Sequence, residues 1–362
     1  MPTVLFVTWD GGGNVNPVLA LGPRLAAQGL TPVGFGPPSL APRFAAAGVA
    51  YVSREAADPW DVAAMAADVR AECRRAAASL AVVDYMLPGA LVGAEAALVP
   101  AVALVHTLYG ALLGDGDFPG PMAMAATVEA LDAAARALGA APVAGLADLL
   151  DRCARVLVAC PASLDACPER WAANVRHVGP VLEAAGDDTG WSPPPGDGPL
   201  VAVSLGTTPM DEAPVLQGVL DGLAGEPVRV AVAVGAHLDA SALDLPANAA
   251  ATGYVRHAAV LPHAAAGVNH GGLGTVLATL AHGVPQVCIP LGREQPHNAR
   301  AVAERGVGLA VDPAAGGEAV RDAVRQVLGE PRYREAAATL ASSIARPGEP
   351  SPAEAEILAV VR

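Results

Sequence analysis

The stretch "NHGGLGTVLATLAHGVPQVCIPLGREQPHNA", Asn269–Ala299, decides the fold of the second half of the chain. An apolar strand ends at His270, and Thr275 opens an apolar helix. Between them, three glycines leave the backbone bare: Gly271, Gly272 and Gly274. Bare amides at a helix N-terminus predict an anion site, and the imidazole and hydroxyl can add hydrogen bonds to a phosphate. For the glycine pattern alone, a tight turn with glycines placed for packing is the alternative.

The same alternation of apolar β-branched runs and helical segments extends through the chain, which predicts parallel, doubly wound sheets. After the first strand, Asn16 as N-cap, Pro17 as first helical residue and Gly29 after the last turn predict a helix. The predicted strands are Thr3–Thr8, Thr31–Phe35, Ser79–Tyr85, Pro100–His106, Arg155–Cys160, Leu200–Leu205, Val228–Val234, Ala266–Asn269 and Gln286–Pro290.

One acidic stretch rich in glycine and proline, "EAAGDDTGWSPPPGDGP" from Glu183 to Pro199, interrupts this pattern and predicts a linker. We therefore predict a first α/β domain over residues 1–183, a linker over 184–198 and a second α/β domain over 199–340. Residues 341–362 are expected to form a helical tail that packs back on the first domain.

Composition restricts the function classes. The 362 residues carry a net charge of −14, which argues against nucleic-acid or anionic-membrane partners because both require a basic face. Neither a membrane-span run nor a basic leader is present in the sequence, so we expect a cytoplasmic monomer or homodimer. The 5 cysteines lack the tight spacing of zinc sites and are expected to be reduced, packed thiols.

With "GVP" and "EQPHNA" added, the segment from Asn269 to Ala299 resembles the signature of family 1 glycosyltransferases of GT-B fold. The bacterial branch that decorates natural products such as antibiotics is the best match. Looser matches are "GNVNP", where the family has a Gly-His-x-x-Pro loop, "VVDY", where it has an aspartate, and "VAVSLGTT", which opens its C-terminal domain. The resemblance implies two Rossmann-like parallel-sheet domains facing a cleft.

The resemblance also implies an activity: inverting transfer of a sugar or deoxysugar from a nucleotide diphosphate to a small apolar or aromatic acceptor, with no metal or cofactor. In the family, the bare loop holds the diphosphate and an acidic-Gln pair binds the sugar hydroxyls. Another segment lies against the nucleotide base, and we expect no tryptophan to stack on that base here. The residues implied to bind the donor are Ser204, Gly206, Thr207, Val255, His270, Gly272, Gly274, Thr275, Glu294 and Gln295.

Two positions depart from the family pattern. Ala278 stands where many members have a glutamate for the ribose hydroxyls. The absence of that carboxylate favours dTDP-sugars over UDP-sugars, unless the alanine is only a helix-packing choice. Asn14 stands where the family has its catalytic histidine. An amide is no base near neutral pH, so Asn14 is expected to orient the acceptor hydroxyl and Asp84 to take the proton.

Further residues are candidates for the acceptor side of the site. His106 and Asp10 are weaker candidates for the base, since Asp10 is as suited to capping the glycine turn. The candidate acceptor-binding residues are Trp60, Met86, His106, Tyr109 and Phe118, with Met122 beside them. Each of these residue types is also common in a plain core.

Three alternative functions stay open. A C-glycosyltransferase of similar fold would not need the missing histidine, and a non-catalytic helper would have lost its base at Asn14. A dinucleotide oxidoreductase is disfavoured because "GGGNVN" lacks the third glycine of the fingerprint and no acidic residue ends the second strand near Phe35. The identities of the sugar and the acceptor are left open by the sequence.

Overall fold

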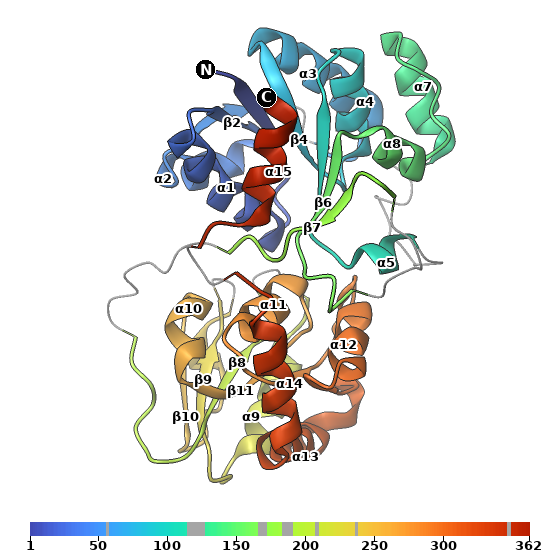
Figure 1. The fold of residues 1–362 in the computed structure, drawn as a ribbon. Coiled ribbons are helices and arrows are strands. Elements are labelled where there is room, and N and C mark those ends of the chain that lie inside the picture. The colour runs from blue at the N-terminus through green and yellow to red at the C-terminus, as the bar shows by residue number, and fades with distance from the viewer. Residues whose placement is uncertain are drawn as a thin grey trace. The chain divides into compact units, whose positions relative to one another are not determined.

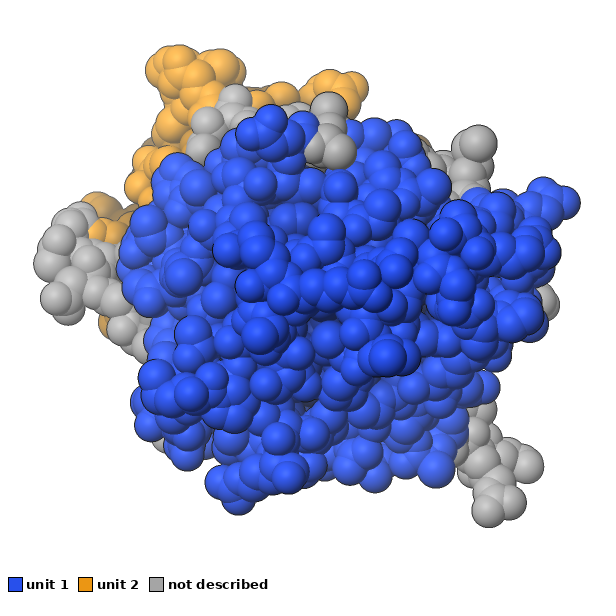
Figure 2. Space-filling view, turned by 90° about the horizontal axis from the view of Figure 1, so that it is seen from above, with its two compact units in different colours: residues 1–183, 350–362 blue, residues 184–349 orange. Residues whose placement is uncertain are grey.

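The computed structural model describes residues 1–55, 58–113, 127–165, 172–182, 191–206, 210–235, 238–345 and 349–362. The chain divides into unit 1, Met1–Glu183 with Pro350–Arg362, and unit 2, Ala184–Glu349, which Figure 2 colours separately. Each unit is an α/β domain with its own parallel sheet, as the sequence predicted. Residues 184–190 of the predicted linker, and the candidates Thr207, Phe118 and Met122, lie outside the described residues.

Unit 1 contains a seven-stranded parallel sheet in the order β3-β2-β1-β4-β5-β6-β7. Its strands are β1 Thr3–Val7, β2 Thr31–Gly36, β3 Ala50–Ser53, β4 Ala78–Asp84, β5 Ala101–Val105, β6 Arg155–Val158 and β7 Val175–His177. The strands next to β1 on both sides bury apolar residues on both faces, as parallel strands between helix layers do. The carboxyl ends of β1, β4 and β5 are therefore neighbours, and the loops after them carry the predicted catalytic residues.

Two groups of helices cover this sheet (Figure 1), with α3, α4, α7 and α8 packed together and α1 packed with α15. The helices of unit 1 are α1 Asn16–Ala27, α2 Ala41–Ala46, α3 Val62–Arg75, α4 Pro88–Ala96, α5 Tyr109–Leu113, α7 Val128–Leu138, α8 Leu146–Arg152 and α15 Pro352–Val361, with short 3₁₀ turns η1 Gly13–Val15 and η2 Pro38–Leu40.

The start of α1 differs from the prediction. The N-cap is Val15, because the turn η1 leads directly into the helix and Asn16 is already helical. The Asn16 side chain instead accepts a hydrogen bond from Arg43 Nη2 at 2.6 Å. At the other end, Gly29 follows the helix with a φ of 84°, in the left-handed conformation that the prediction required.

The C-terminal helix α15 is part of unit 1 although it follows unit 2 in the sequence. It packs on α1, β4 and β6 (Figure 1), and Ala353 and Ile357 are fully buried in the unit 1 core. Ser351 and Glu354 form a capping box at its start. Arg24 of α1 bonds Glu354 at 3.3 Å, which fixes the helix to the first domain.

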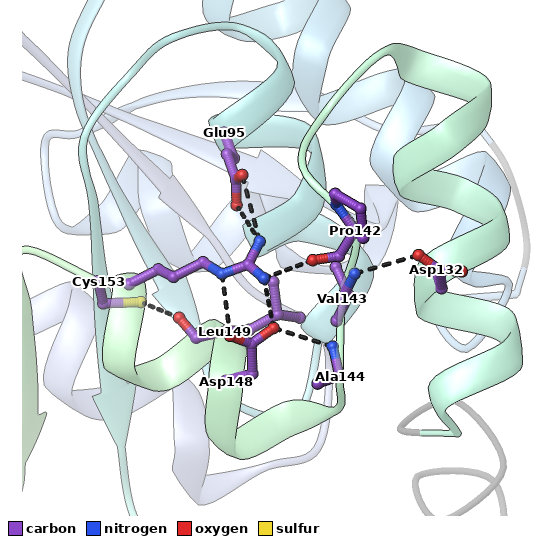
Figure 3. Close-up of polar contacts among 9 residues, drawn as sticks. Glu95, Asp132, Pro142, Val143, Ala144, Asp148, Leu149 and Cys153 are labelled. Atoms are coloured by element: carbon purple, nitrogen blue, oxygen red, sulfur yellow. Dashed lines mark hydrogen bonds and ion pairs between the residues drawn. The ribbon is translucent and has the colours of Figure 1, made fainter.

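A cluster of ion pairs and hydrogen bonds, here called the charged bracket, connects the outer helices of unit 1 around Arg152 (Figure 3). The Arg152 guanidinium at the end of α8 bonds Asp148 of the same helix, Glu95 of α4 and the Pro142 carbonyl of the α7–α8 connection. Asp132 of α7 accepts the Val143 amide of that connection at 3.1 Å. These groups are partly exposed, so the bracket specifies how the helices pack more than it stabilises them.

Unit 2 contains a six-stranded parallel sheet in the order β10-β9-β8-β11-β12-β13. Its strands are β8 Leu200–Ser204, β9 Arg229–Ala233, β10 Ala249–Thr252, β11 Ala264–Asn269, β12 Gln286–Cys288 and β13 Gly308–Ala310. Its helices are α9 Ala213–Leu223, α10 His257–Val260, α11 Leu273–Ala281, α12 Gln295–Glu304, α13 Gly316–Gly329 and α14 Pro331–Ala341, with 3₁₀ turns η3 Ala240–Ala242, η4 Leu261–His263 and η5 Pro313–Ala315.

Two predictions from composition can be compared with the structure. Four cysteines lie among the described residues, and all four are buried free thiols, as expected: Cys73, Cys153, Cys160 and Cys288. Burial raises the pKa of the Cys288 thiol to about 12, which keeps it protonated. Among helices of the described residues, none combines the length and apolar character that a bilayer span requires.

Candidate functional site

The predicted phosphate loop of unit 2 lies between β11 and α11, and the loop after β8 lies beside it. Strand β8 pairs with β11 so that Ser204 is opposite Asn269, and each strand then continues into its loop. The His270 ring lies against two bare glycines. A Cβ on Gly272 would come within 2.3 Å of His270 Nε2, and a Cβ on Gly206 within 3.1 Å. These glycines are therefore required by the position of the imidazole.

The His270 imidazole is neutral at neutral pH. Desolvation lowers its pKa from the ordinary 6.5 to about 4, the positive charges of His257 and Arg293 act in the same direction, and the Ser204 backbone opposes them. A neutral imidazole still has one N–H to donate to a phosphate oxygen. The bound anion would in turn favour protonation of the ring, so the site can gain positive charge when a diphosphate enters.

Buried amides hold this loop in place. Asn269 Oδ1 accepts the Gly271 amide at 2.8 Å, and Asn269 Nδ2 donates to Gln286 Oε1 at 2.7 Å. From α12, Asn298 Nδ2 donates to the Gly271 carbonyl at 2.9 Å. Sequence reasoning missed these three amide side chains. The signal for them was present, because Gln286 is a polar residue in an otherwise apolar strand.

A largely apolar cavity adjoins the loop on the same face of unit 2. Ser204, Val255 and Thr275, all predicted to bind the donor, line it together. Trp191 lines it as well, and its ring lies 5.8 Å from that of His263. This tryptophan comes from the segment predicted as a linker and lies beside Val255.

The predicted sugar-binding residues, Glu294 and Gln295, lie at the start of α12. Gln295 is only 2% exposed. Its side-chain oxygen accepts the Leu291 and Gly292 amides at 2.7 and 3.2 Å, and its nitrogen faces Met210 Sδ at 3.2 Å. Gln295 thus shapes the loop before α12. Glu294, immediately before α12, is partly exposed and makes no side-chain cap to the helix.

Ala278 supports the packing interpretation that the sequence left open. It is 6% exposed and packs in a small apolar cluster with Leu261, Ala264 and Val284. An alanine fits this packing, and the position offers no carboxylate to a ribose hydroxyl.

The predicted catalytic residues of unit 1 form one hydrogen-bonded cluster. Asp84, at the end of β4, is 3% exposed. Its Oδ2 accepts Asn14 Nδ2 at 2.8 Å, and its Oδ1 lies 3.0 Å from both the Met86 amide and His106 Nε2. The fold therefore brings together three residues that were candidates from the sequence: Asn14, Asp84 and His106.

The side-chain amide of Asn14 is hydrogen-bonded to groups of the protein itself. Its two N–H bonds go to Asp84 and to the Trp9 carbonyl, the latter at 3.0 Å, and its oxygen accepts the Gly11 amide at 3.1 Å. Both amide hydrogens are therefore occupied before an acceptor arrives. Asp10 does not take the predicted turn-capping contact, which belongs to Asn14. Instead, Asp10 accepts the Ser39 hydroxyl at 2.7 Å.

The candidate acceptor wall divides into two kinds of residue. Trp60 packs edge-on against Trp9, with ring centroids 5.0 Å apart, and both Trp60 and Met86 are partly exposed. Tyr109 is 2% exposed and begins α5, where its amide donates to Asp165 at 2.9 Å. Tyr109 is therefore a core residue, and burial raises the pKa of its hydroxyl to about 12.

A second cluster in unit 1 has the residue types of a metal site. Ligand atoms of Cys160, Asp165 and His177 lie within 4.8 Å of one another. However, Asp165 already accepts the amides of Tyr109 and Gly110 at the start of α5 and lies 2.9 Å from His177 Nε2. This cluster is best explained as a structural bracket between β7 and α5.

Comparison with known proteins shows what the chain is similar to. Residues 218–360 match the family model "Erythromycin biosynthesis protein CIII-like, C-terminal domain". A 4'-demethylrebeccamycin synthase of Lentzea aerocolonigenes is 37% identical over 174 residues, which are 46% of this chain and 40% of that protein. A demethyllactenocin mycarosyltransferase of Streptomyces fradiae is 33% identical over 49% of this chain and 39% of that protein. The aligned segments thus span about two fifths of these relatives.

The solved structures extend the likeness to the whole chain. The calicheamicin glycosyltransferase CalG4 is 26% identical, with a TM-score of 0.82 over 100% of this chain and 98% of that one. The glycosyltransferase VinC, solved in complex with dTDP, has the same fold at 22% identity, with a TM-score of 0.76 and 99% coverage of both chains. The predicted GT-B fold and the resemblance to antibiotic glycosyltransferases are confirmed.

The lowered histidine pKa predicts a pH-dependent stability. Between pH 6.5 and 4 the unfolded chain binds a proton at residue 270 and the folded chain does not, so acidification through this window favours unfolding. We expect wild type to lose about 1–2 kcal/mol more stability than His270→Gln between pH 7.5 and 5. Urea unfolding of unit 2, followed by its tryptophan fluorescence, measures this difference. Equal losses in both proteins would contradict the prediction.

Proposed function

We propose that this protein is an inverting glycosyltransferase that moves a sugar or deoxysugar from a dTDP-linked donor to a small natural-product acceptor, without a metal or cofactor. The observation that carries the proposal is the His270 imidazole against Gly206 and Gly272, at the start of α11. That arrangement offers bare amides, a helix N-terminus and a ring N–H to one anion. Two of its relatives are named a mycarosyltransferase and a desosaminyltransferase.

The proposed donor position follows from the cavity beside the loop. The diphosphate would lie on the amides before Thr275, and the nucleoside would enter the cavity lined by Val255 and Trp191. The sugar would extend toward Glu294. Stabilisation of the leaving diphosphate by the helix N-terminus and His270 would supply much of the rate enhancement. VinC holds dTDP in its structure, and so does the spinosyn rhamnosyltransferase SpnG, at 22% identity each, which favours a thymidine donor here.

The proposed acceptor position lies at the carboxyl end of the unit 1 sheet, where Trp60 and Met86 flank the cluster around Asp84. The acceptor oxygen would attack the anomeric carbon opposite the diphosphate. A C-glycosyltransferase and a non-catalytic helper remain the alternatives. Incubating the protein with dTDP-glucose, with and without a phenolic acceptor, separates them by mass spectrometry before and after acid hydrolysis: an O-glycoside is cleaved by acid, a C-glycoside of the same mass is not, and a non-catalytic helper releases no dTDP.

The proposed donor class gives a binding prediction. We expect dTDP to bind at least as tightly as UDP in calorimetric titration, because Ala278 provides no carboxylate for a 2′-hydroxyl. Deoxyuridine diphosphate is the control, since it lacks both the 2′-hydroxyl and the thymine methyl group. If the missing 2′-hydroxyl decides the preference, deoxyuridine diphosphate should bind with the affinity of dTDP. If the thymine methyl group decides it, deoxyuridine diphosphate should bind with the affinity of UDP. A clear preference for UDP over both would reject the thymidine donor.

A further inference from the structure

The turn that leads into α12 carries an arginine at a position that favours glycine. The Gln295 amide donates to the Gly292 carbonyl at 3.2 Å, which closes a four-residue turn with Arg293 as its second residue. Arg293 has a φ of 55°, in the left-handed region, where a side chain costs backbone strain and glycine does not. Such strain persists where the surrounding structure fixes it, and it is concentrated at ligand-binding segments. Here the Gln295 side chain fixes the turn through the Leu291 and Gly292 amides.

This turn lies beside the phosphate loop of unit 2. Strands β11 and β12 are parallel neighbours, so the segments that follow them leave from the same edge of the sheet. A Cβ on Gly271 of the phosphate loop would come within 3.1 Å of the Gln295 carbonyl oxygen, and Asn298 Nδ2 donates to the Gly271 carbonyl at 2.9 Å. Desolvation lowers the pKa of His270 to about 4, and the positive charge of Arg293 contributes to that shift. The guanidinium therefore acts on the loop that is proposed to hold the diphosphate.

The charges around the phosphate loop make a cation necessary there. At neutral pH the His270 ring is neutral, and Glu212, which is 7% exposed, acts on it with a negative charge. Glu294 adds a second carboxylate next to Arg293 in the chain. Among the described residues, the exposed Arg293 guanidinium has neither an ion-pair partner nor a hydrogen-bond partner. Because an arginine stays charged at every working pH, it offsets these carboxylates and still has its N–H groups to offer to an anion.

We propose that Arg293 binds the β-phosphate of the nucleotide-sugar donor and stabilises it as the sugar leaves; this rests on the proposed glycosyltransferase activity. The proposed donor position directs the sugar toward Glu294, so the phosphate next to the sugar is the one expected beside Arg293. A guanidinium can donate two parallel hydrogen bonds to two phosphate oxygens. When the bond from the anomeric carbon to the β-phosphate oxygen breaks, its electron pair stays on that oxygen, and the added negative charge strengthens the contact. The acceptor oxygen forms the new bond to the anomeric carbon and releases its proton, ultimately to water.

Calorimetric titration with dTDP and dTMP tests the contact. We expect Arg293→Gln to weaken dTDP binding by about 5- to 20-fold and to change dTMP binding by less than about twofold, because dTMP has no β-phosphate. The difference from wild type should shrink between about 50 and 500 mM salt, since exposed charges are screened. Arg293→Lys keeps the charge and should recover part of the loss. An unchanged dTDP affinity in Arg293→Gln, or equal losses for dTDP and dTMP, would overturn the β-phosphate contact.

Two further variants separate this contact from surface charge and from the turn. Arg300 is also exposed on α12, and it follows Asn298, which faces the phosphate loop, by two residues or roughly 200° around the helix. Arg300→Gln should therefore keep the wild-type dTDP affinity, and a loss equal to that of Arg293→Gln would refute a specific contact. Arg293→Gly relieves the left-handed strain, so its urea midpoint should stay close to that of wild type while dTDP binding weakens. A clear drop in that midpoint would show that the arginine serves the fold and would count against the proposal.

NMR titration and turnover of the full chain complete the test. The pKa of His270, assigned by the loss of its signals in His270→Gln, should rise in Arg293→Gln because a neighbouring positive charge is removed. No rise would show that the guanidinium lies away from the loop. With dTDP-glucose and a phenol, kcat of Arg293→Gln should fall by about 10- to 100-fold, and an unchanged kcat would refute stabilisation of the leaving phosphate. Wild type that binds neither nucleotide rejects the proposed donor site itself, whereas equal dTDP binding by wild type and Arg293→Gln rejects only this contact.

Discussion

His270→Ala is expected to weaken dTDP binding by about 10- to 100-fold and to lower transfer by a similar factor. The physical reason is the loss of a hydrogen bond to a charged phosphate, worth about 1.5–3 kcal/mol, with about 1.4 kcal/mol for each tenfold change in affinity. The imidazole can reach the anion because it lies over Gly206 and Gly272, which have no side chain to displace it. Calorimetry with dTDP and a turnover assay with dTDP-glucose measure the two effects.

Three further substitutions show whether the loss is local. His282→Ala removes an imidazole from the opposite end of α11, where Nδ1 contacts the Ala278 carbonyl at 2.9 Å, and should leave binding unchanged. Gly272→Ala places a Cβ 2.3 Å from His270 Nε2 and should mimic His270→Ala. Gly274→Ala meets no atom within 4 Å, so weaker binding without loss of stability would mean that the ligand needs the space. Unchanged dTDP affinity in His270→Ala would refute the phosphate site.

The sequence predicted the central strands because they are continuous apolar runs, and every one of them was found. It did not predict β3, β10 and β13. Strand β3 is a sheet edge of four residues, β10 is an edge rich in alanine, and β13 is an edge of three residues. Short, partly exposed strands have little hydrophobic signal to detect. Asn16 was misplaced as the N-cap because the 3₁₀ turn before α1 already supplies the helical entry, and no pattern in the sequence specifies such a turn.

The candidate sites were predictable where one segment carries the chemistry and less so where distant segments meet. His270 and its glycines follow one another in the chain, so the loop could be identified from the sequence. Trp191 lines the cavity beside the loop from the segment predicted as a linker, and Asn298 reaches the Gly271 carbonyl from another helix. The prediction for Gln295 assumed an amide directed at a ligand, whereas the fold uses its oxygen on two backbone amides.

Asp84→Asn is expected to cause the largest loss of activity in unit 1, about 10²- to 10⁴-fold with a weakly acidic acceptor. Three nitrogen atoms converge on this carboxylate: Asn14 Nδ2, the Met86 amide and His106 Nε2. An asparagine offers one oxygen and one NH₂ group, so at least one of these donors must face another donor. An unsatisfied buried donor costs about 1–3 kcal/mol, and the cluster loses the carboxylate that is expected to take part in proton transfer.

The comparison with Asn14→Ala separates a role of the Asp84 carboxylate in proton transfer from general damage to the site. Asn14→Ala removes one donor and leaves the His106–Asp84 contact at 3.0 Å, so it should retain substantial activity. The decisive measurement is kcat and KM for wild type and both variants across phenols of increasing acidity. If the Asp84 carboxylate takes part in proton transfer, the defect of Asp84→Asn appears in kcat and shrinks as the acceptor ionises unaided, whereas a structural defect lowers every rate by the same factor. Full rate for Asp84→Asn on the least acidic phenol would show that the acceptor loses its proton without this carboxylate.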